Sequence, residues 1–172
     1  MTIEELLVDK TKKVKEKTET ISNWLLDGSM PLDELIAFAE KSKDSEKATC
    51  IEAIEYATKQ NPKLADESVF LFVTNALTEK AQRVKWESAK VIGNIAHLFP
   101  TKLDKAITHL LENSEYDGTV VRWASAFALG EILKLKTKYN KALIPIIEEK
   151  CIREKDNGVK KKYLDAIKKM NK

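Results

Sequence analysis

The sequence contains few of the residues that mark turns, metal sites or disulfide frameworks. Its 172 residues include five glycines, four prolines, two cysteines and two histidines. Because β-turns depend on glycine and proline, their scarcity favours a helical chain. Cys50 and Cys151 stand far apart, and no Cys-x-x-Cys or His-x-x-x-His pattern occurs. We therefore expect neither a disulfide framework nor a metal site.

Long apolar runs and a strong charge excess are also missing. No run approaches the ~20 apolar residues of a membrane span, and the acidic start of the chain lacks the basic and apolar regions of a signal peptide. We expect a cytoplasmic protein that does not cross a membrane. The formal net charge of +3 argues only weakly for a polyanionic partner. Glycine-rich phosphate loops and nucleophile motifs are absent, so we expect no enzyme, no cofactor and no small-molecule site.

The sequence does contain an internal repeat. Residues 84–95 and 121–132 carry a basic residue, a tryptophan, a serine, an aliphatic pair and a glycine in the same order, 37 positions apart. Weaker copies begin near residues 46 and 159. A repeat of this length indicates helix pairs that bury their apolar faces by stacking on one another.

The repeat predicts where the helices lie. Residues 1–43 are expected to form N-terminal capping helices, in which a charged helix over 3–27 begins with a Thr2–Glu5 capping box and ends at Gly28, before a short helix that ends near Glu40. Long helices are expected at 45–60, 82–98, 119–135 and 157–170. Partner helices are expected at 64–79, 102–113 (capped by Thr101) and 139–152.

These elements predict one continuous all-α domain. Its fold is expected to be a right-handed α-α superhelix of about four helix pairs plus the capping helices. The repeats divide into residues 44–80, 81–116, 117–155 and 156–172, of which the last is partial.

The second strong copy also carries a family resemblance. Val121-Arg122-x-x-Ser125-x-x-Ala128-Leu129-Gly130, preceded by Asp117, resembles the HEAT repeat in its short bacterial form. Residues 84–93 match with lysine for arginine, and the resemblance extends over residues 44–170. The chain as a whole is similar to small bacterial HEAT-repeat proteins. The resemblance implies a scaffold that recognises a partner, and it implies no fixed chemistry.

Two sets of residues could carry that recognition. Trp86 and Trp123 occupy the same repeat position, on the side of each long helix away from the expected core. They form either a partner-binding surface or packing between repeats, with Gly93 and Gly130 making room. The basic series Lys47, Lys85, Arg122 and Lys160 either pairs with acids of neighbouring repeats or follows a phosphate backbone.

We therefore expect a non-enzymatic scaffold that binds a protein or peptide. The alternative is a nucleic-acid-binding module that uses tryptophans interleaved with basic residues. The candidate partner-binding residues are Arg83, Lys85, Trp86, Lys90, Arg122, Trp123 and Lys160. Pairing of the basic residues with carboxylates would disfavour the nucleic-acid alternative. The lysine-rich segments near both ends of the chain are expected to be solvated faces.

Overall fold

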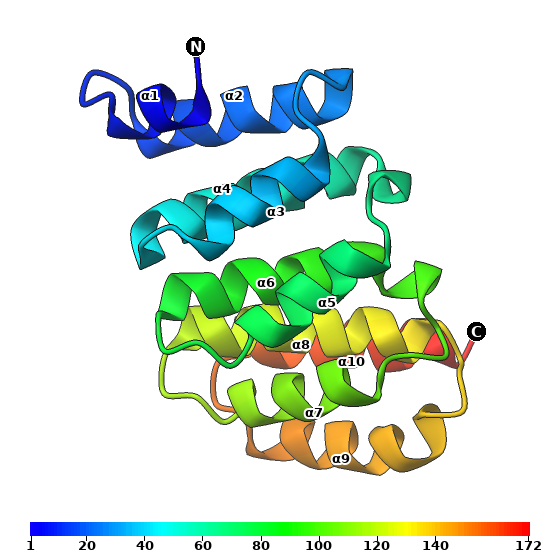
Figure 1. The fold of residues 1–172 in the computed structure, drawn as a ribbon. Helices are drawn as coiled ribbons and strands as arrows, with labels where there is room; N and C mark the ends of the chain where they lie inside the picture. The colour runs from blue at the N-terminus through cyan, green and yellow to red at the C-terminus, as the bar shows by residue number, and fades with distance from the viewer.

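The computed structural model describes residues 1–172 and contains only helices (Figure 1). The α-helices are α1 (Ile3–Val8), α2 (Val14–Asp27), α3 (Leu32–Glu40), α4 (Asp44–Gln60), α5 (Glu67–Ala76), α6 (Gln82–Ile95), α7 (Asp104–Asn113), α8 (Thr119–Lys134), α9 (Asn140–Arg153) and α10 (Asn157–Met170). Two short 3₁₀ helices, Pro62–Leu64 and Ala96–Leu98, follow α4 and α6. No helix is both long enough and apolar enough to span a bilayer.

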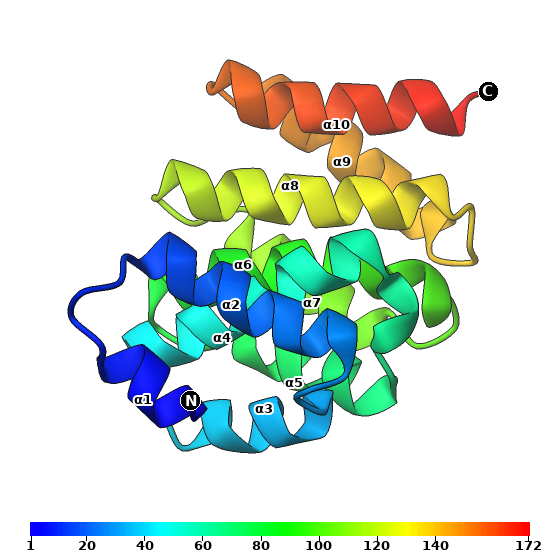
Figure 2. The ribbon, with the colours of Figure 1, turned by 90° about the horizontal axis from the view of Figure 1, so that it is seen from above.

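The helices form two layers that twist along the stack (Figures 1 and 2). The even-numbered helices α2 to α10 stack in sequence order in one layer, and the odd-numbered helices α1 to α9 form the other. Successive even-numbered helices pack much more closely than successive odd-numbered ones. The stack therefore curves toward the even-numbered layer, and we call the free side of that layer the inner face.

Each odd-numbered helix packs more closely on the even-numbered helix that follows it than on the one before it. The architecture is therefore four helix pairs, α3 to α10, preceded by α1 and α2. The boundaries 44–80, 81–116, 117–155 and 156–172 describe the period of the sequence, and they remain a prediction about the units.

A single apolar core runs through the stack, and close helix contacts explain the glycines. A Cβ added to Gly93 would meet the Phe127 ring at 2.3 Å, and one added to Gly130 would meet the Ala166 Cβ at 3.0 Å. Both glycines thus let adjacent long helices approach, but the side chains that face them are Phe127 and Ala166 and not the tryptophans expected from the sequence. Cys50 is fully buried, and burial raises the pKa of its thiol to about 12, so the thiol stays protonated.

The N-terminal helix differs from the prediction. The expected capping box is present, and Gly28 ends α2 with a φ of +81°, but the single helix over 3–27 is wrong. It breaks into α1 and α2 because the Asp9 carboxylate accepts hydrogen bonds from the backbone N–H and the hydroxyl of Thr11, a local bond that competes with the helix.

A second difference lies at the start of α7. Thr101 does not cap this helix, which begins at Asp104 after the buried Leu103. The N–H of Leu103 instead donates to the hydroxyl of Tyr139, at 3.3 Å, from the start of the next repeat. A contact between repeats therefore replaces the local cap.

Candidate recognition surface

The inner face is built from polar and aromatic side chains of neighbouring long helices. They are half-buried, because each lies against the next long helix while one side stays open. The side chains that the structure brings together here are Glu52 and Tyr56 on α4, Arg83, Trp86 and Lys90 on α6, Trp123 and Phe127 on α8, and Lys162 on α10.

Trp123 lies in a cluster between α8 and α10. Its ring is nearly parallel to that of Phe127, with centroids 6.0 Å apart. The Lys162 ammonium lies 4.9 Å from the Trp123 ring centroid and 5.9 Å from that of Phe127. This placement is a cation–π contact, and it covers part of the ring. Trp123 therefore packs between repeats and remains half-buried.

Trp86 occupies the same repeat position with a different environment. It is half-buried against the core, and neither a stacked ring nor a cation lies against it. Trp86 is thus the more available of the two rings for a partner.

The inner basic residues of α6 are paired with carboxylates. The Arg83 guanidinium donates to the Glu52 carboxylate at 3.0 Å and to the Thr49 hydroxyl at 3.1 Å, across the α4–α6 contact. The Lys90 ammonium lies 3.3 Å from Glu87 on its own helix. Neither cation is left as a free positive charge on this face.

Glu87 carries the most perturbed carboxyl group of the surface. It is 2% exposed, and its Oε2 atom has no hydrogen-bond partner. Burial raises the pKa of Glu87 to about 7, and the nearby carboxylates of Glu52 and Glu55 act in the same direction against Lys90. Burial also raises the pKa of Glu55.

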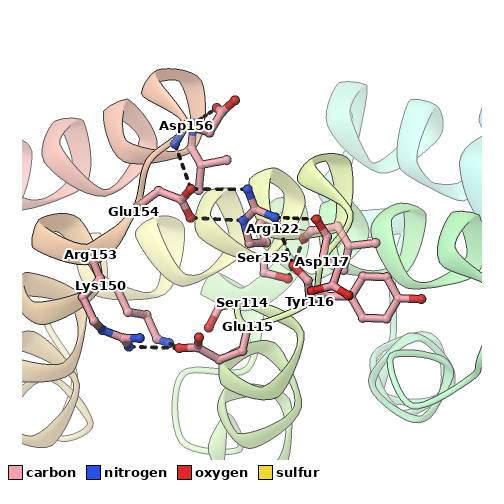
Figure 3. A network of polar contacts seen from close by, with 12 residues as sticks. Ser114, Glu115, Tyr116, Asp117, Arg122, Ser125, Lys150, Arg153, Glu154 and Asp156 are labelled. Atoms are coloured by element: carbon pink, nitrogen blue, oxygen red, sulfur yellow. Dashed lines mark hydrogen bonds and ion pairs between the residues drawn. The ribbon is translucent and has the colours of Figure 1, made fainter.

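The basic series contacts the loops that join the helices. The Lys47 ammonium lies 2.6 Å from Glu79, in the loop before α6. The Arg122 guanidinium binds the Glu154 carboxylate, with its Nε at 3.2 Å, and also donates to the backbone carbonyls of Tyr116 and Asp117 (Figure 3). These two residues form polar links from one repeat to the next.

The other two members of the series lack a carboxylate. The Lys85 ammonium donates to the carbonyl of Leu77 and to the side-chain oxygen of Asn113, and burial lowers its pKa. Lys160 has no carboxylate within 4.0 Å. The structure thus places Arg83, Trp86, Lys90 and Trp123 on the inner face, and Lys85, Arg122 and Lys160 at the loop edge.

A polar cleft lies along this loop edge, between the α7–α8 and α9–α10 loops (Figure 3). Lys150, which is 8% exposed, and Arg153 both point at the Glu115 carboxylate. Their hydrogen bonds and charges lower the pKa of Glu115. Arg122 and Glu154 line the same cleft. Every acid–base pair in it joins two repeats, which explains the cleft as a structural contact.

Sequence reasoning missed the residues that complete the aromatic cluster. Phe127 takes the repeat position of Lys90, and Lys162 takes the position of Ala124 in the last copy, next to the lysine that replaces the tryptophan, Lys161. An alignment of the repeats compares equivalent residues on neighbouring helices, and only such a comparison could have indicated that these side chains meet. No three or more His, Cys, Asp or Glu side chains gather closely enough to hold a metal ion.

Comparisons with known proteins give structural likenesses only. No protein family and no curated protein matches the sequence. A designed armadillo repeat protein in complex with the peptide (KR)4 superimposes with a TM-score of 0.76 at 17% identity, over 98% of this chain and 80% of that one. A computationally designed armadillo repeat protein for modular peptide recognition gives 0.73 at 17%, over 97% and 80%.

These identities are low, so the likeness concerns the fold. The repeat period, the two stacked layers and the superpositions agree on one architecture. The chain folds as a right-handed, all-α solenoid of the armadillo and HEAT type.

Proposed function

We propose that this protein is a non-enzymatic scaffold that binds an extended peptide segment of a partner protein on its inner face. The observation that carries the proposal is Trp86, a half-buried tryptophan on the curved side of the stack with no ring or cation against it. Large amphipathic rings of this kind commonly dominate binding energy at interfaces. Arg83, three residues before Trp86 on α6, and Lys90, four residues after it, lie beside the ring on the helix surface, and their polar groups would supply hydrogen bonds.

The structural neighbours support a peptide as the partner. One of them is solved in complex with the peptide (KR)4, and another is described as designed for modular peptide recognition. A curved layer of stacked helices offers a peptide a surface with a repeating spacing, because each repeat presents the same positions. The inner face of this chain has the same layered form.

The nucleic-acid alternative has less support on this face. On the inner face Arg83 is paired with Glu52 and Lys90 with Glu87, and at the loop edge Arg122 is paired with Glu154. Binding to phosphates gains its affinity from free cations that replace condensed counterions. Cations already neutralised by carboxylates contribute little to such binding.

A selection experiment tests the proposal. Random peptides displayed on phage are selected on the whole protein, and the recovered peptides are measured by fluorescence anisotropy against Trp86→Ala. The matched control is Leu71→Ala, which truncates an apolar side chain 50% exposed on α5 in the opposite layer. We expect affinity to fall more than about tenfold for Trp86→Ala and less than about twofold for Leu71→Ala.

Thermal unfolding of both variants accompanies these measurements. Recovery of no peptide, or an equal loss for Leu71→Ala, would contradict the inner face as the binding surface. A loss for Trp86→Ala in a variant that no longer melts cooperatively would assign the ring to the core instead.

A further inference from the structure

The C-terminal helix carries a concentration of positive charge that its neighbours do not neutralise. Residues 155–172 contain seven lysines and two aspartates, a net charge of +5, whereas the whole chain carries +3. Residues 1–154 are therefore slightly acidic. None of these seven lysines has a carboxylate within 4.0 Å, whereas Lys47, Arg83, Lys90 and Arg122 each have one.

One face of α10 is covered and the opposite face is open. Val159, Tyr163 and Ala166 are at most 2% exposed because they pack toward α8 and α9. Leu164, on the outward side, is 50% exposed. Lys160 and Lys161 lie four and three residues before Leu164, and Lys168 lies four after it, so all three neighbour Leu164 on the helix surface. Lys160 is half-buried at the loop edge of this face, and the exposed Asp165 is the one acid on it, with no lysine nitrogen within 4.0 Å.

We propose that the outward face of α10, formed by Lys160, Lys161, Leu164 and Lys168, binds an acidic segment of a partner protein. Three lysines around one apolar side chain fit a segment in which carboxylates flank an apolar residue. The lysines steer and orient such a segment, and Leu164 gives it a contact that excludes water. This surface is separate from the inner face, and the proposal does not depend on the peptide site there.

The same observations disfavour two other polyanions. Nucleic acids bind sequence-independently through phosphate contacts and through base stacking on aromatic rings. The outward face of α10 has no aromatic residue, and its only aromatic side chain, Tyr163, is buried. A membrane-surface helix inserts several bulky apolar residues. In α10 the bulky residues Val159 and Tyr163 are buried, and Leu164 is its only large apolar side chain that is exposed.

A matched pair of triple variants tests the proposal in the whole chain. One replaces Lys160, Lys161 and Lys168 by glutamine, and the control replaces Lys10, Lys13 and Lys15, which are exposed near the other end of the chain. Each triple lowers the formal net charge from +3 to zero. Any difference between the two therefore reports the position of the charges and not their sum.

The probe is a fluorescently labelled peptide of glutamate and leucine, with duplex DNA and phosphatidylserine vesicles as competing ligands. We expect the α10 triple to weaken peptide binding more than about tenfold, or about 1.4 kcal/mol. The control triple should lose less than about twofold, because its lysines lie in the α1–α2 segment, at the opposite end of the stack from α10, where salt screens their charge from the site. Leu164→Ala alone should lose about threefold.

Several results would overturn the proposal. Equal losses in the two triples would mean that net charge alone drives binding. Failure of the peptide to bind the unchanged protein would remove the site. Tighter binding of duplex DNA or vesicles than of the peptide, with no effect of Leu164→Ala, would assign the face to a nucleic acid or a lipid surface.

Discussion

Arg122 in the middle of the stack and Lys160 in its last helix occupy the same repeat position and behave differently. Arg122 binds the Glu154 carboxylate and two backbone carbonyls, while Lys160 has no carboxylate partner. Lys47 and Lys85 resemble Arg122, since each binds an acceptor in a later segment of the chain, Glu79 and Asn113 respectively.

A repeat position therefore does not fix the role of a charge. The acceptor for each paired member comes from the following repeat, so the role depends on what that repeat supplies. Where it supplies a carboxylate or a carbonyl, the cation links two repeats. On the outward side of α10 no such acceptor is present, and the lysines remain available to a partner. Stability measurements on both regions test this difference.

The largest effect should come from removing α10 altogether. Deletion of residues 157–172 exposes the face of α8 that α10 covers and removes the buried Tyr163 and Val159. We expect a loss of roughly 3 kcal/mol or more with most helical circular dichroism retained, because repeats contact only their neighbours. The α10 lysine triple should keep the stability of the unchanged protein. Complete loss of helical signal after the deletion would show that the repeats fold only together.

The next effect concerns a glycine of the α8–α10 contact. A Cβ at Gly130 would lie 3.0 Å from the Ala166 Cβ and 3.5 Å from the Lys162 carbonyl oxygen. Gly130→Leu should therefore destabilise by more than about 2 kcal/mol through overpacking, although leucine favours helices. Lys168→Leu is the control, since Lys168 takes the glycine position of the last copy and is exposed. A higher melting temperature for Gly130→Leu would refute the close helix contact.

These glycines also show how far the sequence predicts the fold. Equivalent glycines, serines and aliphatic pairs identify stacked helices, because their spacing reports packing between identical units. The expected helices 82–98 and 119–135 agree closely with α6 plus its 3₁₀ extension and with α8. The N-terminal helices lie outside the repeat. There the local hydrogen bond between Asp9 and Thr11 ends α1, and the periodicity of apolar residues gives no sign of this bond.

The candidate surface is less predictable than the fold. The position of Trp123 on a second helix face follows from angles along α8, but its half-covered state depends on Phe127 beside it and Lys162 above it. The acceptor of Arg122 is equally hidden, because Glu154 lies in a loop and has no fixed repeat position. The partner of Lys85 is the amide of Asn113, which a search for acids would not find.

A direct test of the comparison replaces one cation in each region. Arg122→Met leaves the Glu154 carboxylate and the carbonyls of Tyr116 and Asp117 without their donor, so we expect a loss of about 2 kcal/mol in urea unfolding. Lys161→Met, on the open face of α10, should change stability by less than about 0.5 kcal/mol. Similar losses at the two positions would remove the distinction between linking and free cations.

The smallest effect should appear at Glu87, where the inner face has a carboxylate that its neighbours do not fully compensate. Its pKa of about 7 in the folded protein lies above its ordinary value of 4.5, so the folded state binds the proton more tightly than the unfolded state. Stability therefore falls as pH rises through this window and is lowest above it. Glu87→Gln removes that cost but also takes a partner from Lys90, so we expect a net gain of about 1 kcal/mol near pH 8.

The pH dependence separates this cause from a general gain in packing. The gain from Glu87→Gln should shrink toward zero near about pH 5, where the folded protein already holds Glu87 neutral. The control is Glu19→Gln, which changes a carboxylate 52% exposed on α2 and should have little effect at either pH. A gain independent of pH, or a loss near about pH 8, would mean that Glu87 is well compensated by Lys90. The cations and carboxylates that α4 and α6 place on the inner face would then all be paired, and only α10 would carry uncompensated charge there, on Lys162.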